Sequence, residues 1–239
     1  MAYQTVFQRY ELKYMLTEQQ KQLVLAAMAP YMVSDRYGRT TVRNLYFDTD
    51  NYRLIRRSIE KPAYKEKLRI RSYSRADKDS TVFVELKRKS RQVVYKRRVS
   101  LPEGEAMDWL AHSDRSPRED QISREIDYFL RYYETLKPKV FLSYERQAWY
   151  ARDDSGFRMT FDDNILCRQE ELSLQAEVWG QPILPEGMVL MEIKCAGGIP
   201  MWLTELLSRE KIYKTSFSKY GTVYQNIIYP KLKETVKHA

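Results

Sequence analysis

The sequence predicts an α+β fold in which about eight antiparallel β-strands dominate and four or five helices flank them. Two observations carry this prediction. Segments of alternating polar and apolar residues recur along most of the chain, and helical spacing of apolar residues is confined to stretches between them. No internal repeat, low-complexity tract or Gly/Ser-rich linker interrupts the pattern, so residues 1–239 are expected to form a single domain.

The strand candidates are runs rich in Val, Ile, Tyr, Phe and Thr whose polarity alternates with a period of two. Such alternation places successive side chains on opposite faces of a sheet. The eight candidates cover residues 7–16, 40–49, 64–74, 81–89, 93–101, 139–151, 157–165 and 188–195.

Helix starts are marked by capping residues. Thr17, with Gln20 three residues later, has the pattern of a capping box. The run Ser-Pro-Arg-Glu at 116–119 has the pattern of an N-cap, a first-turn proline and a capping glutamate. Pro200 and Ser218 are expected to open two further helices. Apolar residues at helical spacing follow these starts: Leu23, Ala27 and Tyr31; Ile122, Ile126, Phe129 and Tyr133; Leu203, Leu206 and Leu207; Val223, Tyr224, Ile227 and Ile228.

Composition narrows the classes of function. Lys plus Arg number 41 against 32 Asp plus Glu, and the net charge of +9 favours an anionic partner such as polyphosphate, a nucleotide, nucleic acid or a membrane surface. Cys167 and Cys195 form no CxxC pair, which predicts reduced thiols and a cytoplasmic protein. With only His112 and His238, histidine triads and His-rich zinc sites are disfavoured. No apolar run approaches the roughly 20 residues that span a bilayer, and no signal-peptide core is expected.

One face of several strands carries mainly cations. In the segment 64–74, the odd positions are Lys65, Lys67, Arg69 and Arg71, opposite a partly apolar row. The same division recurs in four more strands, where the polar rows contain Glu85, Lys87 and Lys89; Tyr144 and Arg146; Arg158, Thr160 and Asp162; Glu192 and Lys194.

Two interpretations fit these rows. The polar face of an open sheet can simply contact water. Rows of cations repel one another, however, unless an anion or a neighbouring carboxylate compensates. A closed barrel of about eight strands leaves room for side chains or one slender ligand. Because Arg and Lys bind phosphate oxygens through charge-assisted hydrogen bonds, a linear phosphate chain suits such an interior.

Nine short motifs follow one another along the chain. They are RYELKY at 9–14, RNLYFDT at 43–49, KLRIRSY at 67–73, VFVELK at 82–87, VYKRRV at 94–99, SYERQAW at 143–149, RMTFDD at 158–163, MEIK at 191–194 and SFSKY at 216–220. In order and spacing they resemble the VTC domain, the polyphosphate polymerase module of the vacuolar transporter chaperone family. That family belongs to the CYTH-like, or triphosphate tunnel metalloenzyme, superfamily.

The resemblance implies a closed antiparallel β-barrel of about eight strands, with flanking helices, whose tunnel holds triphosphate or polyphosphate. Carried onto this chain, it implies catalytic roles for Arg69, Arg71, Lys87, Arg146, Arg158 and Glu192. The implied substrate-binding cations are Lys13, Lys67, Arg69, Arg71, Lys87, Lys96, Arg98, Arg146, Arg158, Lys194 and Lys219. The implied metal ligands for Mn²⁺ or Mg²⁺ are Glu192 and Glu11. Strand parity had already grouped several of these residues, whereas Lys219 depends on the resemblance alone.

The first strand departs from the hydrolytic members of the superfamily, which begin with ExExK. Here the corresponding residues are Arg9, Glu11 and Lys13, so a cation replaces the first glutamate. A metal that activates water needs carboxylates to hold it. The departure, which VTC-type domains share, therefore favours a polymerase over a hydrolase. Whether Glu11 or Glu85 also contacts the metal stays open.

The predicted activity is transfer of the ATP γ-phosphate to a polyphosphate chain. The alternatives are a triphosphate or nucleoside-triphosphate hydrolase and a non-catalytic polyphosphate-binding module. The expected partners are ATP or another triphosphate and polyphosphate. Nucleic acid is not expected because no binding motif is present. Membrane attachment would require a separate partner, and the sequence predicts no oligomeric state.

Overall fold

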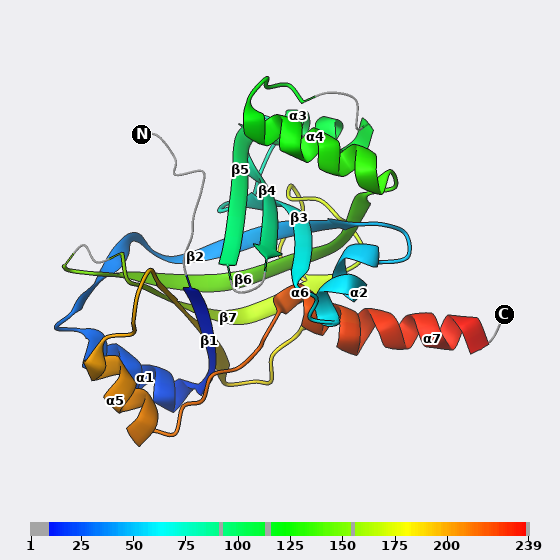
Figure 1. Ribbon diagram of the computed structural model, residues 1–239. Coiled ribbons are helices and arrows are strands. Elements are labelled where there is room, and N and C mark those ends of the chain that lie inside the picture. The colour runs from blue at the N-terminus through cyan, green and yellow to red at the C-terminus, as the bar shows by residue number, and fades with distance from the viewer. Residues whose placement is uncertain (1–9, 91–92, 113–115, 154–155, 238–239) are drawn as a thin grey trace.

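A single curved antiparallel sheet forms the body of the protein (Figure 1). The computed structural model describes residues 10–90, 93–112, 116–153 and 156–237. Along the sheet the strand order is β1-β9-β7-β6-β2-β3-β4-β5, and the short β8 pairs with β7 off this path. The bounds are β1 (Tyr10–Thr17), β2 (Met32–Asp48), β3 (Tyr64–Ser72), β4 (Thr81–Ser90), β5 (Val93–Pro102), β6 (Lys137–Ala151), β7 (Arg158–Arg168), β8 (Gln181–Pro182) and β9 (Met188–Cys195).

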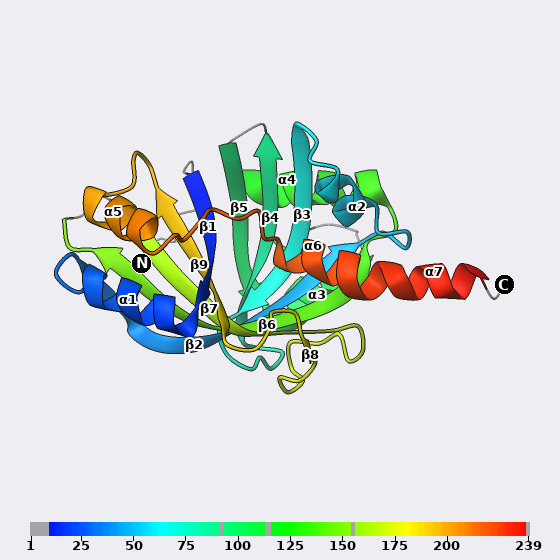
Figure 2. The ribbon, with the colours of Figure 1, turned by 90° about the horizontal axis from the view of Figure 1, so that it is seen from below.

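The prediction of a closed barrel is wrong. β1 and β5 are the two ends of the hydrogen-bonded order, and within the described residues no ladder joins them. The outer edge of β1 instead pairs with a segment near the C-terminus: the Thr215 amide donates to the Lys13 carbonyl at 2.7 Å, and Tyr14 forms a bridge with Lys214. This segment crosses the open side of the sheet between α5 (Met201–Arg209) and α6 (Lys219–Val223), in front of β1 (Figure 2).

Helices pack on the sheet in three groups. Besides α5 and α6, the helices are α1 (Glu18–Met28), α2 (Arg53–Ile59), α3 (Glu103–His112), α4 (Gln121–Tyr133), the π-helix η1 (Tyr224–Ile228) and α7 (Tyr229–Lys237). The capping box that begins α1 is confirmed, with the Thr17 hydroxyl accepting from the Gln20 amide. The starts after Pro200 and Ser218 are confirmed too. The sequence analysis missed α2 and α3.

The start predicted for α4 is wrong. The helix begins at Gln121, and the Asp120 side chain caps it by accepting from the Ser123 amide at 2.8 Å. A tertiary contact holds the preceding residues outside the helix: the Ser116 amide donates to the carboxylate of Asp127, in the middle of α4. The same carboxylate accepts from the Trp109 indole on α3 at 2.7 Å.

The apolar side chains of the strands pack against the helices. On the convex side, Leu68, Ile70, Val84 and Leu86 are fully buried in a cluster with α3 and α4. A second cluster joins β1, β7 and β9 to α1 and α5. A third joins β2, β6 and β7 to α6 and η1 and includes Tyr144. Because Tyr144 has the parity of the polar rows, α6 and η1 fill part of the concave face.

All described strands belong to one sheet, which supports the proposal that residues 1–239 are one domain. The last helix, α7, extends away from this body (Figures 1 and 2). None of the helices among the described residues has the length and apolar character needed to cross a bilayer.

Candidate functional site

The strand registers bring the predicted cations together on the concave face. In the β3-β4-β5 part of the sheet, Arg69 pairs with Glu85, and Glu85 pairs with Arg98. One level further, Lys67 pairs with Lys87, and Lys87 pairs with Lys96. On the other side of the concave face, Arg158 lies opposite Lys194 on β9, and Glu192 lies opposite Lys13 on β1. These residues come from six strands, and ion pairs link most of the cations to four carboxylates, Glu85, Asp162, Glu192 and Glu11.

The first cluster surrounds Glu85, which is 1% exposed. Arg69 donates to one carboxylate oxygen through Nε at 2.9 Å and Nη2 at 2.8 Å. Arg98 contacts the other oxygen at 2.9 and 2.7 Å, and Lys96 approaches it at 2.6 Å. Burial by itself would raise the pKa of Glu85, but Arg71, Arg69, Lys96 and Arg98 together hold it well below its usual value. Glu85 is therefore an ionised counter-charge for these cations.

The second cluster surrounds Asp162, which is fully buried. Arg146 binds it through two contacts of 2.6 Å, and Lys219 contacts it at 2.6 Å. The sequence analysis did not name Asp162 as a site residue, although it shares the parity of Arg158 on β7. Its partner Lys219 lies 57 positions later in the chain, so strand periodicity could not pair them.

The third cluster surrounds Glu192, which is 8% exposed. Its carboxylate has four cationic neighbours but no short contact: Lys194 at 3.2 Å, Lys219 at 3.4 Å, Lys13 at 3.5 Å and Arg146 at 3.6 Å. Charge-assisted hydrogen bonds are typically about 2.7–2.9 Å long. Burial would raise the pKa of Glu192, but Lys219, Lys194, Lys13 and Arg146 hold it well below its usual value. The Glu192 carboxylate is thus ionised yet loosely engaged.

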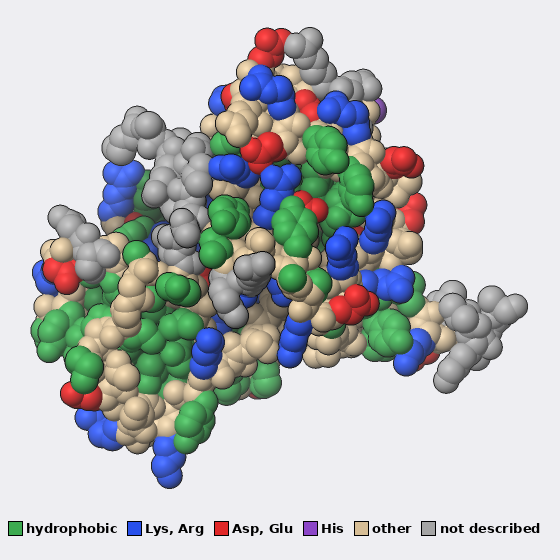
Figure 3. Space-filling model, in the orientation of Figure 1, with side chains coloured by type: hydrophobic (Ala, Val, Ile, Leu, Met, Phe, Trp, Pro, Cys, Tyr) green, Lys and Arg blue, Asp and Glu red, His purple; other side chains and the backbone are tan. Residues whose placement is uncertain are grey.

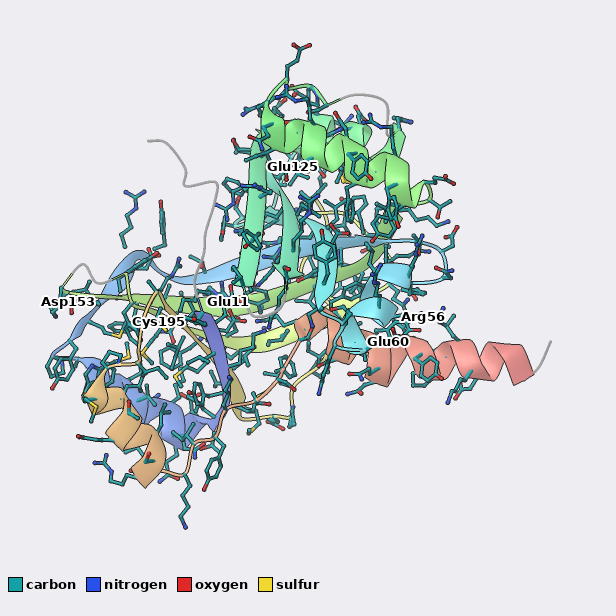
Figure 4. The ribbon with its side chains drawn as sticks, in the orientation of Figure 1. Glu11, Arg56, Glu60, Glu125, Asp153 and Cys195 are labelled. Carbon is teal, nitrogen blue, oxygen red and sulfur yellow. The ribbon has the colours of Figure 1, made fainter. Side chains whose placement is uncertain are left out.

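The fourth carboxylate, Glu11, takes part in an ion pair across the open side of the sheet. It lies near the start of β1 (Figure 4), and the Lys87 ammonium on β4 donates to it at 2.8 Å. Burial would raise the pKa of Glu11, but Lys87 and Lys194 lower it to about 2. An ion pair of side chains therefore joins β1 to β4 where the backbone ladder is open.

Several of the cations also contact neutral groups. Lys13 donates to the Phe217 carbonyl at 2.8 Å, and Lys67 donates to the Ser218 hydroxyl at 2.9 Å. Arg71 donates to Asn44 at 3.0 Å and to the Tyr144 hydroxyl at 2.9 Å. The Arg158 guanidinium lies 4.6 Å from the centre of the Tyr150 ring. Arg9, the cation of the first motif, lies outside the described residues.

Two buried tyrosines escaped the sequence analysis as site residues. The Tyr46 hydroxyl accepts from Arg69 at 2.9 Å. The Tyr144 ring lies under two cations, with Arg146 at 4.9 Å and Lys219 at 4.6 Å from its centre. Their parity on β2 and β6 was the available signal, since Tyr144 shares a face with Arg146.

The carboxylates differ in their ability to hold a metal. Within the described ranges, no three acidic, His or Cys side chains form a cluster that could bind an ion. Glu85 and Asp162 are occupied by short contacts to cations. Glu192 has no contact this short. Glu11, its diagonal neighbour across the β1-β9 ladder, is engaged by Lys87 at 2.8 Å and would have to exchange this lysine for the ion. Since Mg²⁺ in phosphoryl-transfer sites uses one or two carboxylates plus substrate phosphates, Glu192 and Glu11 fit an ion shared with a bound phosphate chain.

Comparison with known proteins identifies the family of the chain. The family model described as the VTC domain matches residues 8–228. The chain belongs to the VTC domain family. This confirms the family that the motifs resembled.

Solved structures show that this VTC domain shares its fold with distant proteins. A candidate adenylate cyclase of Bacillus halodurans matches with a TM-score of 0.56 and 17% identity, over 90% of this chain and 96% of its own. A candidate adenylate cyclase of Vibrio parahaemolyticus matches with a TM-score of 0.50 and 10% identity, over 93% and 99%. At these identities the likeness concerns the fold alone. No curated protein matches the sequence of this chain.

Proposed function

We propose that this VTC domain protein is an ATP-dependent polyphosphate polymerase that extends a phosphate chain inside its cationic cavity. The observation that carries the proposal is the charge of the concave face. Eleven predicted cations gather there around four carboxylates, so seven positive charges would be in excess with every group ionised. Family membership supports the same substrate class.

In the proposed reaction, an oxygen of the terminal phosphate of the chain attacks the γ-phosphorus of ATP. One new phosphoanhydride bond forms, the bond to the β-phosphate oxygen breaks, and ADP leaves. Because the attacking oxygen is already ionised, neither a protein nucleophile nor a general base is needed. The protein contributes position and charge, which are the main requirements of phosphoryl transfer.

The arginines supply most of this contribution. Arg69, Arg71, Arg146 and Arg158 have planar forks that bind phosphate oxygens at fixed geometry, and their charge stabilises the transferring group. Lys87 adds a point charge beside them. Glu192, with Glu11, would hold the Mn²⁺ or Mg²⁺ ion, which neutralises charge on the phosphates when bound. The proposal places the protein in the cytoplasm with ATP.

A hydrolase of triphosphate or nucleoside triphosphates is the second candidate, because Glu11 and Glu192 lie on adjacent strands and form a possible carboxylate pair. Incubation of the full chain with ATP and Mn²⁺ or Mg²⁺ separates the candidates. Long polyphosphate in the product supports the polymerase, and orthophosphate alone supports the hydrolase. Neither product, with tripolyphosphate still bound, would indicate a non-catalytic binding module.

A further inference from the structure

The cationic row on the concave face continues beyond the clusters described above. The β3-β4 register places Lys65 opposite Lys89, next to the pair formed by Lys67 and Lys87. Two like-charged pairs therefore follow one another along β3 and β4, and the two lysines of each pair lie directly opposite each other. Such pairs destabilise a sheet unless another charge compensates.

Of the four lysines at this end of the concave face, Lys87 is paired with Glu11 at 2.8 Å, and the other three have no carboxylate partner among the described residues. In the described part of the chain, no carboxylate oxygen lies within 4 Å of the ammonium groups of Lys65, Lys67 or Lys89. Lys65 donates to the Ser58 carbonyl at 3.2 Å, and Lys67 to the Ser218 hydroxyl. Burial, together with the neighbouring lysines, lowers the pKa of Lys67 to about 7 and also lowers that of Lys65. Lys65, Lys67 and Lys89 therefore have no counter-charge in the described protein, and an anionic ligand would supply one.

The kind of cation also changes along β3. Arg71 and Arg69 are followed by Lys67 and Lys65 toward the start of the strand. Arginine forks fix a phosphate group in one orientation, whereas lysine is a flexible point charge that tolerates a shift of the ligand. The row from Arg71 to Lys65 covers six residue steps, about 20 Å at the usual strand rise. A triphosphate is shorter than this row.

The surface beyond Lys65 is basic as well. Lys65 bonds to the end of α2, whose Arg53, Arg56 and Arg57 are exposed, and the exposed Glu60 and Lys61 follow the helix. Lys and Arg side chains gather over α2 in Figure 3, and Figure 4 shows Arg56 on this helix and Glu60 just after its end. A phosphate chain leaving the cavity at the lysine end would therefore meet further positive charge.

We propose that Lys65 and Lys89, together with Lys67 and Lys87, form a subsite for the growing polyphosphate chain, beyond the phosphates that react at the arginines. This inference rests on the proposed function and gives it a direction. The reacting phosphates lie among Arg69, Arg71 and Arg146, and the product extends past the lysine end toward α2. The subsite therefore distinguishes long polyphosphate from triphosphate.

The test compares binding of two ligands by isothermal titration calorimetry of the full chain, without ATP or turnover. The double variant Lys65→Met/Lys89→Met removes both charges and keeps the apolar stems. Affinity for long-chain polyphosphate should fall by about tenfold or more, because two charge-assisted contacts are lost. Affinity for tripolyphosphate should stay within about twofold. The melting temperature should not fall, since the variant removes a like-charged pair.

The control is Lys231→Met/Lys233→Met, which removes the same charge from the exposed surface of α7. An equal loss in the control would mean that only the net charge matters, and the subsite would be rejected. Equal losses for both ligands, or no loss for either, would also reject it. Because the readout is binding alone, a protein that makes no polyphosphate from ATP can still show the subsite, so the two proposals fail separately.

Discussion

Replacing Glu192 by Gln distinguishes two roles of this residue: a ligand of the metal ion and a counter-charge for the neighbouring cations. The substitution keeps the shape of the side chain and removes its negative charge. If Glu192 holds the metal ion, Mn²⁺- or Mg²⁺-dependent turnover should be largely lost. Lys219 and Arg146 would keep their charges because Asp162 still pairs with them, and the repulsive carboxylate would be gone, so tripolyphosphate should still bind, and more tightly than to the unchanged protein.

The cost in stability can be worked from the contacts of Glu192. Removing one partner of a buried ion pair typically costs about 3–5 kcal/mol. Here the contacts are 3.2–3.6 Å long, and Arg146 and Lys219 retain Asp162 while Lys13 retains a backbone carbonyl. We therefore expect the lower end, about 3 kcal/mol, which corresponds to a fall in melting temperature of about 6–12 °C.

Asp162→Asn is the matched control. It also removes one buried negative charge, but it breaks the 2.6 Å contacts to Arg146 and Lys219. Its loss of stability should be the larger, about 4–5 kcal/mol. Calorimetric melting of both variants, with and without tripolyphosphate, measures the difference, because the added anion should restore more stability to the Glu192 variant.

Two results would refute this reasoning. Normal metal-dependent turnover of the Glu192→Gln protein would remove Glu192 from the mechanism. An unchanged melting temperature together with unchanged tripolyphosphate affinity would show that the four cations do not depend on its charge.

Two further predictions concern the cations. Arg69→Ala should weaken tripolyphosphate binding by about 1.5–3 kcal/mol, and it should lower the melting temperature because Glu85 loses one of three cationic partners. Arg69→Lys should lose less binding free energy. Unchanged binding of the Arg69→Ala protein in titration calorimetry would exclude Arg69 from the site. In the free protein, burial lowers the pKa of Lys67 and of Lys194 to about 7. A bound polyanion favours the charged lysines and raises these pKa values, so binding at pH 8 should take up protons and weaken as the pH rises from about 7 to 9. Titrations in buffers of different ionisation enthalpy measure this uptake, and zero uptake at pH 8 would mean that phosphate does not contact these lysines.

The periodicity of the chain was enough to predict the sheet faces. Alternation along 64–74 separated Arg69 and Arg71 from Leu68 and Ile70, and the structure places the two sets on opposite faces. The capping box at the start of α1 followed from local sequence in the same way. Both are properties of residues close in the chain, where backbone geometry alone decides which side chains share a face.

Local rules failed where a distant residue competed. Ser116 has the sequence of a helix cap, but its amide is bonded to Asp127, and Asp120 caps the helix instead. Closure of the sheet failed for a similar reason, since the free edge of β1 pairs with Thr215 rather than with β5. Such partners are set by packing across the fold.

The balance of charge inside the cavity was decided by the tertiary structure alone. The sequence predicted rows of cations that repel one another, with only an occasional glutamate. The folded chain instead places Glu85 and Asp162 within short contact of those cations and leaves Glu192 loosely held. Parity assigns a side chain to a face but gives no distance to charges on other strands. Because electrostatic energy depends on those distances and on burial, the sequence could assign these residues to one face of the sheet but could not distinguish the closely paired charges from the loosely held ones.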